Sequence, residues 1–261
     1  MPLIAVDIGN SYAKFACYPP GTLDPTQSSG LPTPSKLFRC PINSLDLAGL
    51  AQWLPREQAT WRVAAVQSRA AAVLATWVQN VRERDDYRLL AHTDLPLIVT
   101  VHRPDMVGVD RLSAAVGANR LRTPGRAAIV VDAGTVINIE LVDTDGSFQG
   151  GSFFPGLRLC QEAFRNGTAY LPLIEAVASE RLPIGNNSRE AIQRGLFWGG
   201  IGAVREIVGC IQQTVEHSGK GIAEVFVTGG DPRPFSEFIS EAKLVPNLVL
   251  GGIAVAASQC D

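Results

Sequence analysis

One hydrophobic pattern organises this chain and occurs in it twice. A run of apolar residues ends at an acid, passes through a short glycine turn, and resumes with alternating apolar and polar positions. Residues 129–141 show it as IVVDAGTVINIEL, and residues 3–17 show it as LIAVDIGNSYAKFAC. Such a pattern predicts a hairpin of two β-strands, with Asp132 or Asp7 at its tip. One hairpin would be weak evidence, but its repetition about half a chain away indicates two similar halves facing one another across a cleft.

Helix and strand patterns alternate along the rest of the first half. We expect a short helix over 45–53, a short strand over 62–66, an amphipathic helix over 70–81, and an apolar strand over 97–101. Residues 19–41 are rich in Pro, Gly, Ser and Thr, so we expect a surface loop there without a catalytic part. The alternation of strands and helices predicts an α/β first half.

The second half begins with a turn and contains the second hairpin. A tight turn at 143–146 leads to a third strand, and a strand over 224–228 runs into a Gly-Gly-Asp-Pro turn. Between them a long helix begins at Asn187 or Ser188, either of which could cap it. We therefore expect two domains, residues 1–118 and residues 119–261.

Composition and charge narrow the class of protein. A chain of 261 residues suits two compact domains. Its formal net charge of -2, without a basic block, argues against nucleic acid or an anionic membrane as the main partner. The five cysteines are widely spread and form no C-x-x-C, as expected of reduced thiols in a cytoplasm. The sequence shows no signal peptide and no apolar segment of transmembrane length, so we expect a cytoplasmic protein.

Three acids beside glycines are the candidates for chemistry. Asp7 and Asp132 each end an apolar strand and precede a glycine turn with a hydroxyl residue, which can hold a cation while backbone N–H groups face a phosphate. Asp110 follows Gly108 at the start of a helix-forming run, where it could accept a proton from a substrate hydroxyl. The next residue, Arg111, could grip a carboxylate with its planar fork. An acid that favours the helix dipole, beside a surface arginine, explains the same pair without any ligand.

Glycines elsewhere leave two interpretations open. Gly150-Gly151 and Pro155-Gly156 let bare backbone border a ligand, or they simply form turns. Gly229-Gly230 borders the adenosine in a nucleotide-binding domain, or forms a plain strand-to-helix turn. The glycines within 195–202 indicate close helix packing, because no strand precedes them and the third glycine of G-x-G-x-x-G is missing.

Taken in order, these motifs resemble those of the type III pantothenate kinases. They are DIGNS at 7–11, GVDR at 108–111, DAGT at 132–135, the glycines of 150–156, and NSREAI at 187–192. That family shares the actin-like ATPase fold, which is ribonuclease H-like, with actin and the sugar kinases. The resemblance therefore implies an α/β protein of two duplicated α/β domains around a central cleft, and it runs along nearly the whole chain.

The resemblance also implies an activity: a homodimer that uses ATP to phosphorylate the primary hydroxyl of pantothenate, the first step of coenzyme A biosynthesis. Asp110 would be the general base. Asp7 would lie near Mg²⁺, and Asp132 would carry a monovalent cation, K⁺ or NH₄⁺. The residues that would contact ATP are Asp7, Ile8, Gly9, Asn10, Ser11, Tyr12, Ala13, Lys14 and Thr135. Those that would contact pantothenate are Gly108, Val109, Asp110, Arg111 and Ser188.

Some positions depart from the family pattern and keep two alternatives open. Ser11 and Ser188 replace threonines but retain the hydroxyl. The segment 101–104, Val-His-Arg-Pro, lacks a tyrosine that the family often carries over the substrate. A kinase of the same superfamily with another small-molecule acceptor is one alternative, and an acceptor screen would distinguish it. A non-enzymatic transcriptional accessory factor is the other, although such a factor has no need of three acids beside glycine loops.

Overall fold

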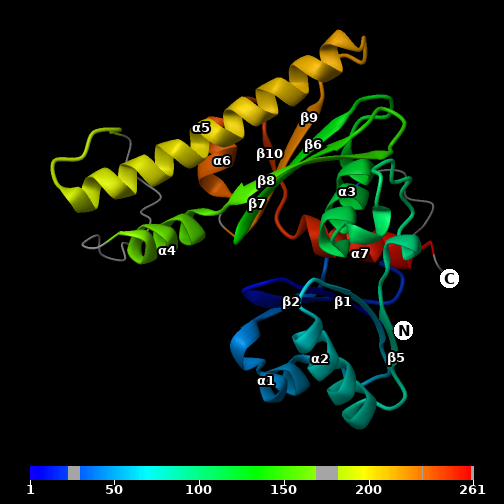
Figure 1. The fold of residues 1–261 in the computed structure, drawn as a ribbon. Coiled ribbons are helices and arrows are strands. Elements are labelled where there is room, and N and C mark those ends of the chain that lie inside the picture. Colours follow the sequence, from blue (N-terminus) through cyan, green and yellow to red (C-terminus); the bar gives the residue numbers. More distant parts are fainter. Residues whose placement is uncertain (23–29, 169–181, 231, 260–261) are drawn as a thin grey trace. The chain divides into compact units, whose positions relative to one another are not determined.

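The computed structural model describes residues 1–22, 30–168, 182–230 and 232–259, and its chain forms two compact units (Figure 1). Unit 1 comprises Met1–Thr123, Gly146–Gln149 and Asn247–Asp261, whereas unit 2 comprises Pro124–Asp145 and Gly150–Pro246. The boundary that we expected near residue 118 lies close to the first crossing between the units. The C-terminal residues, however, return to unit 1 instead of remaining with the second half.

Unit 1 is built on a five-stranded mixed sheet in the order β3-β2-β1-β4-β5. Its strands are β1 (Leu3–Ile8), β2 (Tyr12–Tyr18), β3 (Lys36–Pro41), β4 (Thr60–Ala65) and β5 (Asp86–Leu89). Strands β1 and β3 are antiparallel to β2, while β4 runs parallel to β1 and β5 parallel to β4. The hairpin predicted from the first hydrophobic pattern is therefore confirmed as β1 and β2.

Unit 2 repeats this arrangement. Its strands are β6 (Ala128–Ala133), β7 (Val136–Val142), β8 (Phe148–Pro155), β9 (Glu224–Gly229) and β10 (Lys243–Leu244). The first two residues of β8 belong to unit 1. Their order is β10-β9-β6-β7-β8, with β6 antiparallel to β7 and parallel to β9, and β10 parallel to β9. Read from β8, the order of the strands matches that of unit 1. The predicted duplicated α/β fold is confirmed by this repeat.

Seven α-helices lie in the described part of the chain. They are α1 (Leu47–Trp53), α2 (Ser68–Val81), α3 (Val109–Leu121), α4 (Leu157–Gly167), α5 (Ser188–His217), α6 (Arg233–Phe238) and α7 (Leu248–Ala257). The helices predicted over 45–53 and 70–81, and the one from Asn187 or Ser188, agree with α1, α2 and α5 within two residues. Among the described residues, the structure contains no helix with the length and apolar character needed to span a bilayer.

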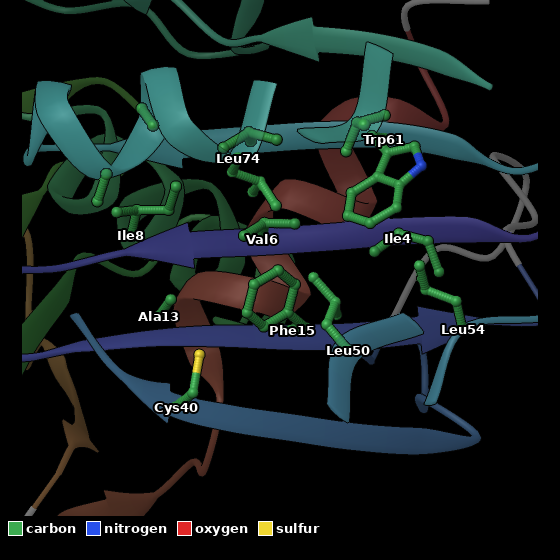
Figure 2. Close-up of a cluster of buried hydrophobic side chains, with 14 of the residues drawn as sticks. Ile4, Val6, Ile8, Ala13, Phe15, Cys40, Leu50, Leu54, Trp61 and Leu74 are labelled. Atoms are coloured by element: carbon green, nitrogen blue, oxygen red, sulfur yellow. The ribbon is translucent and has the colours of Figure 1, made fainter. Parts of the chain in front are cut away.

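The core of unit 1 explains why β1 is apolar at every position except Asp7. Figure 2 shows Ile4, Val6 and Ile8 of β1 in one buried cluster with Phe15 and Trp61 from the neighbouring strands. Helix α7 also contacts β1, so the strand has no solvent-exposed face, and all six of its residues are buried. A central strand covered in this way needs apolar side chains on both faces. Asp7 is the polar exception, and this makes its position informative.

Helix α7 also packs against α3, and two glycines allow the close approach. A Cβ atom at Gly252 would lie 1.7 Å from the backbone oxygen of Ser113 in α3. A Cβ atom at Gly117 would lie 2.7 Å from Cδ1 of Leu248 in α7. Because α3 carries Asp110 in its first turn, the C-terminal helix supports the element that bears the candidate base.

Two predicted elements are wrong. Residues 97–101 form no strand: Val99 makes one isolated parallel bridge to Phe148, and Ile98 is 70% exposed, so the apolar run is too exposed to join a sheet. Residues 19–41 are not a loop throughout, because β3 pairs with β2 from Lys36 to Pro41. The prolines and serines upstream concealed the short alternation of β3.

The close packing predicted for the glycines within 195–202 holds at one position only. A Cβ atom at Gly200 would lie 3.1 Å from Cδ2 of Leu157. At Gly195, Gly199 and Gly202 it would meet no heavy atom within 4 Å of the described structure. Spacings of four and three residues place these three glycines on one face of α5, and all three are exposed.

We expect Gly252→Ala to destabilise the protein. The new methyl group would meet the backbone of α3, so the two helices must separate, and overpacking of this kind costs about 1–3 kcal/mol. Gly209→Ala in α5 is the matched control, because a Cβ atom there meets nothing within 4 Å and alanine favours a helix. Urea unfolding of both variants measures the effect. Equal stability of Gly252→Ala and the wild type would contradict the α3–α7 contact.

Candidate active site

The first glycine loop holds a buried carboxylate against a lysine. Asp7 is 5% exposed near the end of β1, and Lys14 is its register partner on β2. Lys14 Nζ lies 3.3 Å from Oδ2 of Asp7. The turn between them is closed by the N–H of Gly9, which donates to the carbonyl oxygen of Tyr12 at 3.1 Å. The hairpin geometry therefore brings a carboxylate and an ammonium group, seven residues apart in the sequence, onto the same side of the sheet.

The start of α3 holds a second carboxylate. Asp110 is the second residue of this helix, and its Oδ1 accepts a hydrogen bond from the N–H of Arg111 at 2.9 Å. Gly108 is the residue before the helix, and a Cβ atom there would lie 2.4 Å from that same Oδ1. A side chain at position 108 would displace the carboxylate, so the glycine is required by the position of Asp110.

The two carboxylates influence one another inside unit 1. Burial raises the pKa of Asp7, the charge of Lys14 lowers it, and the charge of Asp110 raises it further. Burial also raises the pKa of Asp110, against the N–H and the charge of Arg111 and the charge of Lys14. Two acids that are costly to ionise favour a bound cation, which would relieve the repulsion. A raised pKa also brings Asp110 closer to the range in which a general base works at neutral pH.

Arg111 is placed beside the same carboxylate. Its guanidinium carbon lies 5.8 Å from the centre of the Phe148 ring, within the range of a cation–π contact. Phe148 is itself held by the backbone, because its N–H donates to the oxygen of Ile98 at 2.8 Å and its oxygen accepts from the N–H of Thr100 at 3.0 Å. The segment 97–101 thus supports Arg111 through Phe148, although it is not a strand.

The second glycine loop lies in an equivalent hairpin that is one residue shorter and has different neighbours. Asp132 is half-buried near the end of β6, and its register partners are Asn138 on β7 and Thr228 on β9. Because residues directly opposite one another share a face of the sheet, three oxygen-bearing side chains form a row. Uncharged oxygens beside one carboxylate suit a hard cation of low charge. The described residues contain no cluster of three or more His, Cys, Asp or Glu that could hold a metal, so an ion at either loop would need other ligands as well.

Glycines hold two further segments against this second loop. The N–H of Gly156 donates to the oxygen of Thr135 at 3.0 Å, and a Cβ atom at Gly156 would lie 2.6 Å from that oxygen. Gly229 has φ +116, and its Cβ atom would lie 2.4 Å from the oxygen of Ala133, which also accepts from the N–H of Gly230. These backbone contacts leave no room for a side chain at Gly156 or Gly229, so they explain both glycines without a ligand. Their proximity to a ligand remains a prediction.

The N-terminus of α5 is capped by Asn187 and not by Ser188, the other residue that the sequence offered for this role. Its Oδ1 accepts from the N–H of Glu190 at 3.0 Å, and its Nδ2 donates to Oε1 of Glu190 at 2.9 Å. The other carboxylate oxygen of Glu190 accepts from the N–H of Asn186, and this bond lowers the pKa of Glu190. Ser188 is exposed as the first residue of the helix, and the cap does not use its hydroxyl.

The structure brings some predicted site residues together in unit 1 and assigns others to unit 2. Asp7, Lys14, Asp110 and Arg111 form one electrostatic group in unit 1, whereas Asp132, Thr135 and Ser188 belong to unit 2. Sequence reasoning missed Phe148, Asn138 and Thr228. Asn138 could have been found by counting outward from the turn, since residues equidistant from a hairpin turn are paired. Phe148 and Thr228 carried no local signal.

Two solved structures share the fold of this chain. A protein from Campylobacter jejuni described as a Baf family transcriptional activator superposes with a TM-score of 0.61 at 17% identity, covering 98% of both chains. A glucokinase from an Antarctic psychrotroph gives a TM-score of 0.50 at 13% identity, covering 100% of this chain and 99% of that one. At such low identities these likenesses show the fold alone, which is that of the actin-like ATPases and sugar kinases.

The sequence comparison is more specific. Residues 3–209 match the family model for type III pantothenate kinase. A type III pantothenate kinase from Chlorobium luteolum is 31% identical over 233 residues, which are 88% of this chain and 83% of that protein. The chain belongs to the type III pantothenate kinase family, and the resemblance found in its motifs is confirmed.

We expect Asp110→Asn to raise the thermal stability of the unliganded protein at neutral pH. The pKa of Asp110 is raised by folding, so the folded state holds its proton more tightly than the unfolded chain, in which an aspartate has a pKa of about 4. The free energy of unfolding therefore falls as pH rises from the unfolded pKa to the folded one, and it stays lower above that window. Asparagine does not ionise and avoids this loss.

Thermal unfolding between pH 4.5 and 8 measures the effect. The stabilisation by Asp110→Asn should shrink toward the acid end, and each 1 kcal/mol corresponds to about 2–4 °C in a chain of this size. Asp105→Asn is the control, because Asp105 is exposed and the hydrogen bond from Arg103 lowers its pKa. A thermal midpoint of Asp110→Asn no higher than that of Asp105→Asn would contradict the assigned burial.

Proposed function

We propose that this chain transfers the terminal phosphoryl group of ATP to the primary hydroxyl of pantothenate, giving 4′-phosphopantothenate in the first step of coenzyme A biosynthesis. One observation carries the proposal. Asp7 interacts electrostatically with both Lys14 and Asp110. These residues lie in a chain that matches the pantothenate kinase family over residues 3–209. Phosphoryl transfer requires mainly positioning and charge neutralisation, which such a group supplies.

Asp110 is the general base. Its carboxylate is oriented by the N–H of Arg111 and by the lack of a side chain at Gly108. Its raised pKa favours removal of the hydroxyl proton of pantothenate as the phosphorus–oxygen bond forms. The proton passes to Asp110, and ADP leaves with the electron pair of the broken bond.

Residues 7–14 hold the phosphates of ATP. The turn supplies backbone N–H groups, and Lys14 supplies a positive charge. Mg²⁺ is usually bound by one or two carboxylates together with substrate phosphates and water, and Asp7 fits this requirement because its buried carboxylate favours a nearby cation. When bound, the ion would neutralise charge on the phosphates.

In unit 2, Asp132 holds a monovalent cation, K⁺ or NH₄⁺, and Thr135 contacts ATP. The neutral oxygens of Asn138 and Thr228 in the same row support this assignment, because the more weakly hydrated monovalent ions need fewer charged ligands than a divalent ion does.

Residues 108–111 and Ser188 bind pantothenate. Arg111 offers a planar fork that matches the carboxylate of the acceptor, and Phe148 restricts its orientation. Ser188 contributes a hydroxyl that the helix cap does not occupy.

We also propose that the protein is a cytoplasmic homodimer that associates through unit 2. Large apolar side chains are exposed on this unit, at Phe153 (62%), Phe164 (39%), Leu182 (66%) and Ile184 (75%). The exposed face of α5 that carries Gly195, Gly199 and Gly202 would let a second helix approach closely. The described cysteines, two of them buried, are all free thiols, which suits a reducing compartment.

The proposed reaction is tested by ATP consumption with purified protein, pantothenate and Mg²⁺, with K⁺ present or replaced by Na⁺. We expect turnover that depends on pantothenate and needs K⁺ or NH₄⁺. Asp110→Asn should reduce kcat by at least about 10²-fold, the contribution typical of a general base, while ATP still binds.

A panel of small alcohols and sugars is the control for the acceptor. ATP consumption with one of these acceptors, and none with pantothenate under any ion, would reject the pantothenate assignment while retaining the kinase fold. Unchanged turnover of Asp110→Asn would remove the assignment of the base.

For the dimer, we expect the double substitution Gly199→Gln and Gly202→Gln to give a monomer in light scattering. Glutamine favours a helix over glycine by about 0.5–1 kcal/mol, so α5 itself should be retained. Glu216→Gln, an exposed site in the last turn of the same helix, should leave the dimer intact. A double variant that remains dimeric would place the interface elsewhere.

A further inference from the structure

An arginine on β3 extends the charged row of the first loop. Asp7 pairs in register with Lys14, and Lys14 pairs in turn with Arg39. Residues that oppose one another directly in a sheet share a face. An acid and two cations therefore follow one another across β1, β2 and β3, beside the turn that we assign to the phosphates. The motifs found in the sequence did not include Arg39.

Tyr12 holds this arginine at the edge of the loop. The guanidinium carbon of Arg39 lies 3.6 Å from the centre of the Tyr12 ring, which is van der Waals contact. Tyr12 also closes the loop, since its carbonyl oxygen accepts from the N–H of Gly9. The end of β3 is joined to the same loop, because the N–H of Ile42 donates to the oxygen of Ser11 at 3.0 Å. The side chain of Arg39 is therefore held at the loop by Tyr12, and the end of its strand is held there by the backbone of Ile42.

The charge of Arg39 is available to a ligand. The residue is exposed, and in the described part of the chain no carboxylate lies within 4.0 Å of it. Lys14, by contrast, shares its charge with Asp7. An arginine whose flat face rests on an aromatic ring keeps the N–H groups at its edge for hydrogen bonds, and this fork matches two phosphate oxygens.

We propose that Arg39, positioned by Tyr12, binds the polyphosphate of the nucleotide and sets the affinity for ATP. The inference rests on the proposed role of residues 7–14 as the phosphate loop. A triphosphate brings several negative charges, and Lys14 is already engaged, so a second cation beside the loop has a defined partner. The carboxylate of the acceptor is already assigned to Arg111, which lies on α3.

The first experiment compares Arg39→Gln with Arg56→Gln. Arg56 is also an exposed arginine of unit 1, but it precedes β4, whose first residue pairs with Leu3 at the end of β1 remote from Asp7. We expect Arg39→Gln to raise the KM for ATP and the Kd for Mg-ADP about 10-fold, as for loss of one charge-assisted hydrogen bond. The kcat and the KM for pantothenate should change less than about 2-fold, and Arg56→Gln should match the wild type.

A second comparison tests the positioning by Tyr12. Tyr12→Phe keeps the ring and should raise the KM for ATP less than Tyr12→Ala does. If the ring acts through Arg39, the double variant Tyr12→Ala, Arg39→Gln should be no weaker for ATP than Arg39→Gln alone. Additive losses would overturn the positioning role of Tyr12.

Binding of Mg-ADP and of inorganic tripolyphosphate, measured by calorimetry, separates this inference from the proposed reaction. A wild type that binds both ligands more tightly than Arg39→Gln would support the inference even if pantothenate were not phosphorylated. Equal affinities of Arg39→Gln and Arg56→Gln would overturn it while leaving the reaction intact. A rise in the KM for pantothenate alone would also overturn it and would assign Arg39 to the acceptor.

Discussion

The buried carboxylate of Asp7 is the constraint on which the candidate site depends. Burial makes its ionised form costly, Lys14 across the hairpin offsets part of that cost, and the nearby charge of Asp110 adds to it. A chain optimised only for stability would not retain two acids in this arrangement, because each favours its neutral form there. Their retention is understandable if a cation and a phosphorylated ligand complete the charge balance during function. The family to which the chain belongs, and the kinase reaction proposed for it, supply both.

This charge arrangement needs a rigid support, which the packing of α3 and α7 provides. Asp110 is carried by the first turn of α3, and α3 lies against the C-terminal helix at a distance that only glycine at 252 permits. Helix α7 in turn contacts β1, the strand that carries Asp7. The two carboxylates, more than a hundred positions apart in the sequence, are thus positioned by elements that share one contact network. The return of the last residues to unit 1 is therefore part of the construction of the site.

The two glycine loops show how one duplicated hairpin supports two kinds of chemistry. Each loop has an acid near the end of its first strand and a partner directly opposite on the second strand. In the first loop that partner is Lys14, which suits a site for phosphates, whereas in the second it is Asn138, which suits a cation held by one carboxylate and neutral oxygens. The first row continues beyond Lys14 to Arg39 on β3. On the other side of the acid, Asp132 is flanked by Thr228 on β9, whereas Asp7 is flanked by Ala64 on β4. The two halves of the duplicated fold thus differ in register partners while they share the same strand order.

The sequence by itself determined the two hairpins, the main helices and the positions of the three acids. These depend on local periodicity, because a strand alternates every two residues and a helix repeats every 3.6. It failed where an element depends on distant neighbours: β3 is a strand because β2 pairs with it, and 97–101 is not one because it meets a single residue of β8. Only the tertiary structure decided that α7 belongs with unit 1, that Asn187 rather than Ser188 caps α5, and that Asp7 and Asp110 interact. Such contacts follow from the packing of side chains across the chain, and no local pattern of apolar and polar residues encodes them.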